Sequence, residues 1–275
     1  MPSESSKRVV HASQINFRVS IYEVKKQNSS IERGERCAIA IMAKAPRAGF
    51  SKTRLCPPLA PEQAATLSAA FLNDTSESLA AAATRAPITP YAAYAPLGTE
   101  ALLARHLAPQ TKLLLADGSI AVPPGVEGFG RCLLHAIAAQ FEQGHAAAAV
   151  LSSDTPNLPA AYLVQASDLL LAGGPDRIVF GACDDGGYYF LGMNRLHDGL
   201  FRDIAWSTET VAETTRLRAA EQGLEIIELP VWYDIDDAES LARLDRETEG
   251  DAAPATRRAL AALSVAAILA GQPAA

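Results

Sequence analysis

The chain has 275 residues, of which 49% are hydrophobic and 20% are charged, and its formal net charge is −7 at pH 7. This composition is typical of a globular protein, and the length suits one large α/β domain or two small ones. The negative net charge argues against general binding to nucleic acid, and no apolar run is long enough to span a membrane. Its cysteines (Cys37, Cys56, Cys132 and Cys183) form no C-x-x-C pair, which favours reduced thiols in a cytoplasmic protein.

The N-terminal extension, residues 1–36, is polar and charged and lacks the apolar segment of a secretory signal. Within it, Ile15, Phe17, Val19 and Ile21 alternate with polar residues, which is the period of a half-buried strand. We expect the extension either to add one strand, at a sheet edge or at a partner subunit, or to be disordered. Because this strand could pair at a partner subunit, the sequence is also compatible with a homodimer.

From residue 37 to residue 249, apolar strand-like runs alternate with helical patterns. The expected strands are Ala38–Ala43, Tyr91–Ala95, Lys112–Leu115, Ala147–Leu151, Arg177–Ala182, Tyr188–Leu191 and Glu225–Leu229. The expected helices are Pro61–Thr84, Thr99–Leu107, one that contains Leu134, Ile137 and Phe141, then Ala160–Leu171 and Thr208–Gln222. This alternation predicts a Rossmann-like α/β three-layer sandwich with a mostly parallel central sheet. Residues 250–275 predict a final Ala-rich helix, about Ala255–Ala270, that packs outside as an appendage.

The first apolar run ends at Ala43 in a loop that contains four basic side chains and one glycine. At the carboxyl edge of an α/β sheet such a loop suits a polyanion, because Lys and Arg supply charge and backbone N–H groups near a glycine approach phosphate closely. The expected nucleotide- and phosphate-binding residues are Lys44, Gly49, Lys52, Thr53 and Arg54. The alternative interpretation is a solvated basic loop without function.

The same loop differs from a P-loop at its two defining glycines. Lys52-Thr53 matches the end of the pattern G-x-x-x-x-G-K-[ST], but Pro46 and Ser51 stand at the glycine positions. The sequence therefore argues against an ATPase or GTPase of the P-loop type.

Two aspartates follow core strands of the predicted sheet. Asp154 comes after the buried strand Ala147–Leu151, and Asp236 comes after the last core strand. A carboxylate beside a phosphate-binding loop repels its substrate unless a divalent cation lies between them, and Mg²⁺ is typically held by one or two carboxylates plus substrate phosphates. We therefore expect Asp154 and Asp236 to bind Mg²⁺ (or Mn²⁺). The alternative is that each aspartate caps the helix that follows it.

A glycine-rich turn, Asp184–Gly187, joins two predicted strands, and its glycines permit positive φ and close backbone approach. It is either an ordinary hairpin or a place where a sugar or base hydroxyl binds. Trp206 either forms a wall of the acceptor site or packs in the core. The residues assigned to the acceptor side are Gly186, Gly187, Tyr188 and Trp206, and those assigned to catalysis are Lys52, Asp154 and Asp185.

Five motifs occur in a fixed order along the chain. They are Lys44-Ala-Pro-Arg-Ala-Gly-Phe-Ser-Lys52-Thr-Arg54-Leu, Ser153-Asp154-Thr-Pro156, Asp185-Gly-Gly-Tyr-Tyr, Trp206-Ser-Thr and Asp234-Ile-Asp236-Asp237-Ala-Glu239-Ser-Leu. Together they resemble the radical-SAM/selenodomain-associated transferase type 1 family. The resemblance covers about Cys37–Leu244 and implies a GT-A-like nucleotide-diphospho-sugar transferase domain over residues 37–249. The first loop is also similar to that of phospholactate guanylyltransferases, in which Lys and Arg grip a nucleoside triphosphate.

Three functions are compatible with these motifs. The first is a metal-dependent glycosyltransferase that uses a nucleotide-activated sugar and a small-molecule acceptor. The second is a nucleotidyltransferase that moves a nucleoside monophosphate from an NTP to a phosphorylated small molecule. The third is a non-catalytic nucleotide-binding protein, which is supported by Gly128–Cys132, because the family usually has an acidic Gly-Asp-Leu-Gly-Glu-Arg-like stretch there.

Overall fold

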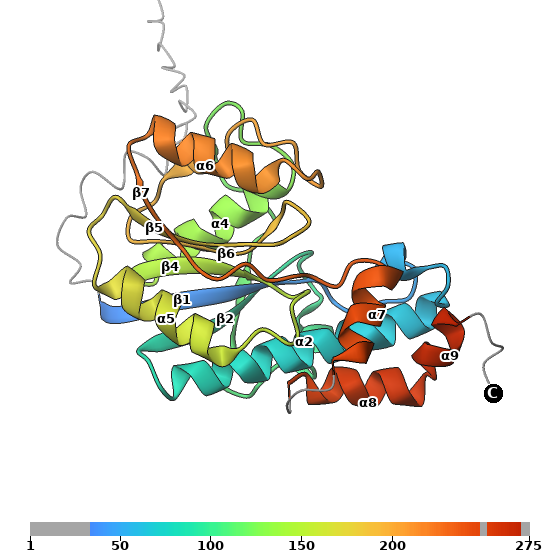
Figure 1. Ribbon diagram of the computed structural model, residues 1–275. Coiled ribbons are helices and arrows are strands. Elements are labelled where there is room, and N and C mark those ends of the chain that lie inside the picture. The colour runs from blue at the N-terminus through green and yellow to red at the C-terminus, as the bar shows by residue number, and fades with distance from the viewer. Residues whose placement is uncertain (1–33, 248–251, 271–275) are drawn as a thin grey trace, which may run out of the picture. The chain divides into compact units, whose positions relative to one another are not determined.

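The computed structural model describes residues 34–247 and 252–270 (Figure 1). The strand expected within residues 1–36 lies outside the described residues, which begin in the first strand of the sheet. Within the described part of the chain, no helix is long and apolar enough to cross a membrane. All four cysteines are free thiols.

Strands and helices alternate along the chain, as the sequence pattern predicted. The strands are β1 (Gly34–Ala43), β2 (Ile88–Tyr94), β3 (Lys112–Leu115), β4 (His145–Ser152), β5 (Arg177–Ala182), β6 (Tyr188–Met193) and β7 (Glu225–Glu228). The α-helices are α2 (Pro61–Ala83), α3 (Glu100–Ala104), α4 (Phe129–Glu142), α5 (Ala160–Leu171), α6 (Val211–Glu221), α7 (Ala238–Arg246), α8 (Pro254–Ala262) and α9 (Val265–Leu269). Two short 3₁₀ helices are η1 (Thr53–Leu55) and η2 (Asp198–Phe201).

The described strands form one sheet in the order β3-β2-β1-β4-β6-β5-β7. Strand β1 pairs in parallel with β2 on one side and with β4 on the other. Strand β6 is antiparallel to both β4 and β5, and the remaining pairs are parallel, so the mostly parallel sheet is confirmed. From β1 the chain continues to β2 and β3 on one side of the sheet and then crosses to β4 on the other side. An open α/β sheet commonly binds its ligand at such a switch point, outside the carboxyl ends of the strands.

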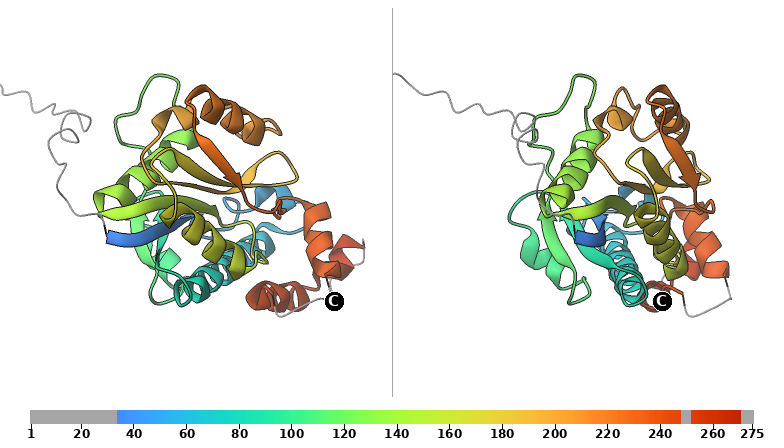
Figure 2. Two further views of the ribbon diagram at one scale, coloured as in Figure 1. Left: turned by 60° about the vertical axis from the view of Figure 1, so that its left-hand side comes forward. Right: turned by 90° about the vertical axis from the view of Figure 1, so that its left-hand side faces the viewer.

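Helices cover both faces of the sheet, with α2 and α5 on one face and α4 and α6 on the other (Figures 1 and 2). Alternate residues of a strand point to opposite faces, and β1 shows this division directly. Ile39 belongs to the core cluster that contains Leu79 of α2 and Leu170 of α5. Ala40 belongs to the cluster that contains Ile137 of α4. The three-layer arrangement therefore follows from strands that are buried on both faces.

A third core cluster lies where α2 meets the C-terminal helices, and it includes Leu55, Phe71, Leu244, Leu260 and Val265. Two expectations for the C-terminal segment are wrong. The segment forms two helices instead of one, because the backbone at Ser264 turns left-handed with φ of 52°. It is also not an outer appendage, since Leu260 and Val265 are buried in this cluster.

The buried carboxylate of Asp74, on α2, caps the start of α8. Its Oδ1 accepts a hydrogen bond from the backbone N–H of Ala255 at 2.9 Å, and its Oδ2 accepts one from Thr256 at 2.7 Å. Ala253, the residue before α8, has no side chain that can cap the helix. A side chain from another helix therefore supplies the cap.

We expect Asp74→Ala to lower the free energy of unfolding by about 2 kcal/mol, because it leaves two N–H groups, one buried and one half-buried, without acceptors. Glu77→Ala, at an exposed position of the same helix, should change stability by less than about 0.5 kcal/mol. Urea unfolding followed by circular dichroism measures both. Equal stability of the two variants would show that Asp74 does not cap α8.

Candidate active site

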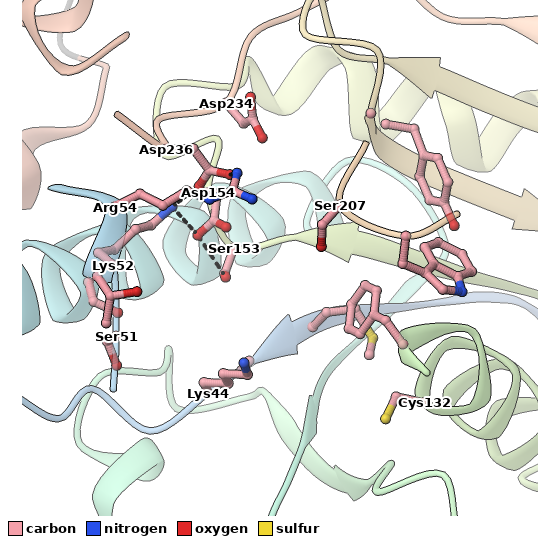
Figure 3. Close-up of a pocket in the computed structure, with 18 of the residues that line it drawn as sticks. Lys44, Ser51, Lys52, Arg54, Cys132, Ser153, Asp154, Ser207, Asp234 and Asp236 are labelled. Carbon is pink, nitrogen blue, oxygen red and sulfur yellow. Dashed lines mark hydrogen bonds and ion pairs between the residues drawn. The ribbon is translucent and has the colours of Figure 1, made fainter. Parts of the chain in front are cut away.

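A cleft of about 710 Å³ opens at the carboxyl edge of the sheet (Figure 3). Segments that are distant in sequence line it, and they include the loop after β1, the residues after β4, the turn between β5 and β6, and the segment before α7. The lining residues include Lys44, Lys52, Thr53, Arg54, Asp154, Asp185, Gly187, Tyr188, Trp206, Asp234 and Asp236. Of the residues assigned from sequence, all line the cleft except Gly49 and Gly186.

Lys52 lies at the centre of the charged groups. Its side chain is only 7% exposed, and its Nζ is 2.8 Å from Oδ1 of Asp154 and 2.8 Å from Oδ1 of Asp236. The same nitrogen donates to the backbone carbonyl of Ile235 at 2.7 Å. Burial alone would lower the pKa of Lys52, but attraction by the two carboxylates outweighs it and raises the pKa above its ordinary value. Lys52 is therefore a buried ammonium between two carboxylates.

Neither of these aspartates caps a helix. Asp154 lies just beyond β4, where its Oδ1 also accepts from the Ser153 hydroxyl at 3.2 Å. Asp237 caps α7 by accepting from the backbone N–H of Ser240 at 2.8 Å, which leaves the neighbouring carboxylate of Asp236 in the cleft. The capping alternative is therefore wrong for both Asp154 and Asp236.

The backbone on either side of Asp234 and Asp236 is fixed to the loop after β4. The N–H of Ile235 donates to the carbonyl of Asp154 at 2.9 Å. The buried side chain of Asn157 donates to Tyr233 Oη at 2.7 Å and to Glu247 Oε2 at 3.0 Å. These hydrogen bonds hold the acidic segment beside Asp154.

Asp234 is a site residue that the sequence reading did not assign. Burial first, and the nearby carboxylates of Asp236, Asp185 and Asp154 second, raise its pKa to about 7, against the effect of Lys52. A signal for it existed, because residues two apart in an extended segment point to the same side, and Asp236 was already assigned. The cleft thus gathers four carboxylates around one buried ammonium.

These carboxylates suit a hard divalent cation. Ligand atoms of Asp185, Asp234 and Cys183 lie within 4.8 Å of one another. The thiol of Cys183 is a poor ligand, because burial first and nearby aspartates second raise its pKa well above the ordinary value and keep it protonated. Carboxylate oxygens are what Mg²⁺ and Mn²⁺ prefer. The predicted pair, Asp154 and Asp236, directs one oxygen of each carboxylate at Lys52 instead of at this group.

The basic loop presents exposed cations to the cleft. Lys44 is exposed, and the Arg54 side chain is 64% exposed with its guanidinium 3.6 Å from Oδ2 of Asp236. Gly49 does not line the cleft. It adopts φ of +75° in the turn that returns the chain to Ser51, whose backbone N–H donates to Arg47 at 3.0 Å. Gly49 therefore shapes the loop without lining the cleft.

The turn between β5 and β6 is held against the start of α6. A Cβ on Gly186 would lie 2.0 Å from the carbonyl oxygen of Glu209, and the Gly186 carbonyl accepts from Ala212 N–H at 2.8 Å. Asp185 is exposed and accepts from the N–H of Gly187 at 2.7 Å. The turn therefore joins a hairpin, as one of the two interpretations predicted. Gly186 allows this hairpin to pack against the start of α6, while Asp185 lines the cleft.

Aromatic side chains form the other end of the cleft. Trp206 contacts Phe129 edge-on, with ring centroids 5.8 Å apart. A Cβ on Gly130 would lie 2.8 Å from the Trp206 ring, so glycine is required where the indole packs on α4. The buried Tyr188 hydroxyl and Trp206 Nε1 have no hydrogen-bond partner among the described residues. Trp206 is thus both part of the cleft wall and packed against a helix.

Comparisons with known proteins agree with this fold. Residues 78–208, just under half of the chain, match a family model described as an uncharacterized protein conserved in bacteria (DUF2064). That range includes Asp154, Asp185 and Trp206 but not the basic loop. No curated protein matches the chain in sequence.

Among solved structures, one from Desulfovibrio desulfuricans G20, named as a candidate nucleotide-diphospho-sugar transferase, is 24% identical, with a TM-score of 0.72, and the match covers 86% of this chain and 98% of that one. The chain therefore shares the α/β fold of that structure, which agrees with the fold that the motif resemblance implied. A cytidylyltransferase from Leptospira borgpetersenii matches 87% of this chain and 99% of its own, at 13% identity and a TM-score of 0.47. Rv0371c from Mycobacterium tuberculosis H37Rv, in complex with manganese, matches 76% of this chain and 97% of its own, at 15% identity and a TM-score of 0.39.

The raised pKa of Asp234 predicts how stability depends on pH in metal-free buffer. With a native pKa of about 7 and an ordinary value of 3.8, the native state binds more protons than the unfolded state between these values. Stability therefore falls as pH rises from about 4 through about 7. Asp234→Asn should not show this loss. The free energy of unfolding of Asp234→Asn, relative to that of wild type, should therefore be about 1–2 kcal/mol higher at about pH 8 than at about pH 4, a value that allows for solvent screening.

Urea unfolding in the presence of EDTA measures this difference. Asp168→Asn, at an exposed position of α5, is the matched control; it keeps Asp234 and should lose stability with rising pH as wild type does. A stability difference between Asp234→Asn and wild type that stays constant with pH would contradict the prediction.

Proposed function

We propose that this protein is a metal-dependent glycosyltransferase that uses a nucleotide-activated sugar and a small-molecule acceptor. One observation carries the proposal. A cleft at the switch point of a GT-A-like sheet brings exposed cations, Lys44 and Arg54, beside a cluster of four aspartates. This combination suits a diphosphate that is bound partly by basic side chains and partly through a divalent cation.

The exposed cations are proposed to bind the phosphates of the donor. Lys44 follows β1 directly and Arg54 lies in η1, so the two reach the cleft from the two ends of the basic loop. Asp154, Asp234 and Asp236 are proposed to hold Mg²⁺ or Mn²⁺. When bound, the ion would offset the charge that develops on the leaving nucleoside diphosphate. Positioning and charge stabilisation supply most of the rate in such a reaction.

The acceptor is proposed to bind between the Asp185 turn and the aromatic end of the cleft. An acceptor oxygen forms a bond to the anomeric carbon, the bond from that carbon to the phosphate oxygen breaks, and the nucleoside diphosphate leaves with the electron pair. Asp185 is exposed, and among the described residues only its Oδ1 accepts a backbone hydrogen bond. Its carboxylate is proposed to accept the proton that the acceptor hydroxyl loses.

Nucleotidyl transfer is the second candidate, and the charge of the loop favours it. Lys44, Lys52 and Arg54 place three cationic side chains at one cleft, which suits a triphosphate as well as a diphosphate. In this reaction an acceptor phosphate oxygen attacks the α-phosphorus of an NTP and pyrophosphate leaves. The third candidate is a non-catalytic nucleotide-binding protein. It rests on Gly128–Cys132, which lacks the acidic residues that the resembled family usually has there. The packing of Trp206 explains the glycine at 130 but not the other residues of this stretch.

We expect Asp154→Asn to lower turnover about 100-fold or more, because it removes one negative charge from the cation-binding group with little change of shape. Transfer is measured with a panel of NDP-sugars and of NTPs, each with and without Mg²⁺. The class of donor that supports turnover decides between the first two candidates. Asp168→Asn, on the exposed face of α5, should turn over like wild type.

Unchanged turnover of Asp154→Asn would contradict both enzymatic proposals. Nucleotide binding without turnover of any donor would leave the non-catalytic candidate.

A further inference from the structure

The Lys52 ammonium has no hydrogen left for a substrate. An ammonium group carries three N–H donors. Here they face Asp154 Oδ1, Asp236 Oδ1 and the carbonyl of Ile235, at 2.8, 2.8 and 2.7 Å. Figure 3 shows the contacts of Lys52 with this acidic group. In this arrangement Lys52 cannot donate to a phosphate unless it gives up one of these acceptors.

The position that Lys52 occupies is also the one a cation between Asp154 and Asp236 would take. Mg²⁺ binds oxygen at about 2.0–2.1 Å. An ammonium nitrogen 2.8 Å from both oxygens therefore excludes an ion from the same place. Moreover, Asp185 and Asp234 add two further carboxylates, so the group has more negative charge than one ammonium offsets. A divalent ion is the stronger counter-charge for such a group.

The backbone of Lys52 is consistent with a residue that is held by its partners. Its φ and ψ are 51° and 41°, the left-handed region that a residue with a side chain seldom adopts. Such a conformation persists where surrounding contacts impose it. Lys52 also lines the cleft that Arg54 and Lys44 line, so its four-carbon side chain already lies at the cavity where a substrate's phosphates would bind.

We propose that Lys52 is an exchangeable counter-ion: a divalent cation takes its place between Asp154 and Asp236, and the released ammonium becomes a ligand for the substrate's phosphates. This rests on the proposed function in one respect, namely that the cleft binds a divalent cation. The consequence is that the cation strengthens polyphosphate binding in two ways, by its own charge and by freeing Lys52. In the alternative, Lys52 remains in place and the ion binds only Asp185 and Asp234.

Amine labelling distinguishes these two arrangements. The protein is treated with an acetylating reagent with and without saturating Mn²⁺, the labelling rate of each lysine is read by peptide mass spectrometry, and bound Mn²⁺ is measured on the same samples by electron paramagnetic resonance. Exchange predicts that Mn²⁺ raises the labelling rate of Lys52 about tenfold or more, within the range of typical coupling between sites. Lys112, an exposed lysine on β3, should label at the same rate in both samples.

Two results would overturn the exchange. Bound Mn²⁺ with Lys52 still protected would show a permanent counter-ion, while the metal part of the proposed function would stand. No bound Mn²⁺ would remove both the exchange and the metal dependence. Release of Lys52 by Mn²⁺ in a protein that transfers nothing from any donor would support the exchange and contradict the proposed activity.

A substitution gives an independent measurement. Lys52→Met keeps the length of the side chain without its charge and should bind Mn²⁺ about tenfold more tightly than wild type, because no ammonium competes. Mn²⁺ should also strengthen binding of inorganic triphosphate less in Lys52→Met than in wild type, and Lys112→Met should match wild type in both measurements. An equal effect of Mn²⁺ on triphosphate binding in wild type and Lys52→Met would contradict the exchange.

Discussion

The contacts of one buried ammonium fix the geometry of the cleft. Lys52 joins the loop after β1 to Asp154 at the end of β4 and to Asp236 before α7, although 184 residues separate it from Asp236. The carboxylates of Asp154 and Asp236 both contact the Lys52 ammonium, whose side chain is almost fully buried. Removing one charge of such a buried group leaves its partner without a counter-charge, which is destabilising. The remaining features of the site, including the exposure of Lys44 and Arg54 on the cleft's basic side, are arranged around this centre.

The surrounding fold explains why the charges meet there. Parallel pairing of β1 with β4 brings their carboxyl ends together, and the hydrogen bond from Ile235 to Asp154 places the acidic segment against the same edge. Apolar packing supports the arrangement from below, since Phe71 of α2 lies under Lys52 with its ring centroid 5.5 Å from Nζ. The third core cluster, which joins α2 to the C-terminal helices, thus continues directly beneath the cleft. Stability of the C-terminal segment and geometry of the cleft depend on the same helix.

Much of this could be predicted from the sequence because the signals are local. The alternation of apolar runs gave the strands and helices of the sandwich, and the ends of those strands pointed to Lys52, Asp154 and Asp236. What the sequence could not supply is how distant groups pair. The triple contact of Lys52, the raised pKa of Asp234 and the packing of Trp206 on Gly130 all depend on residues that meet only in the folded chain. The break at Ser264 was missed because alanine-rich sequence on both sides favours a continuous helix.

We propose that the cleft binds a nucleotide through its basic loop and a divalent cation through its aspartates. Titration calorimetry with NDP-sugars and NTPs, with and without Mn²⁺, on wild type and Asp154→Asn tests it most directly. We expect Mn²⁺ to strengthen binding of one class of nucleotide to wild type about tenfold or more, and we expect Asp154→Asn to lose most of this gain. Equal nucleotide affinity in all four combinations of protein and metal would contradict it.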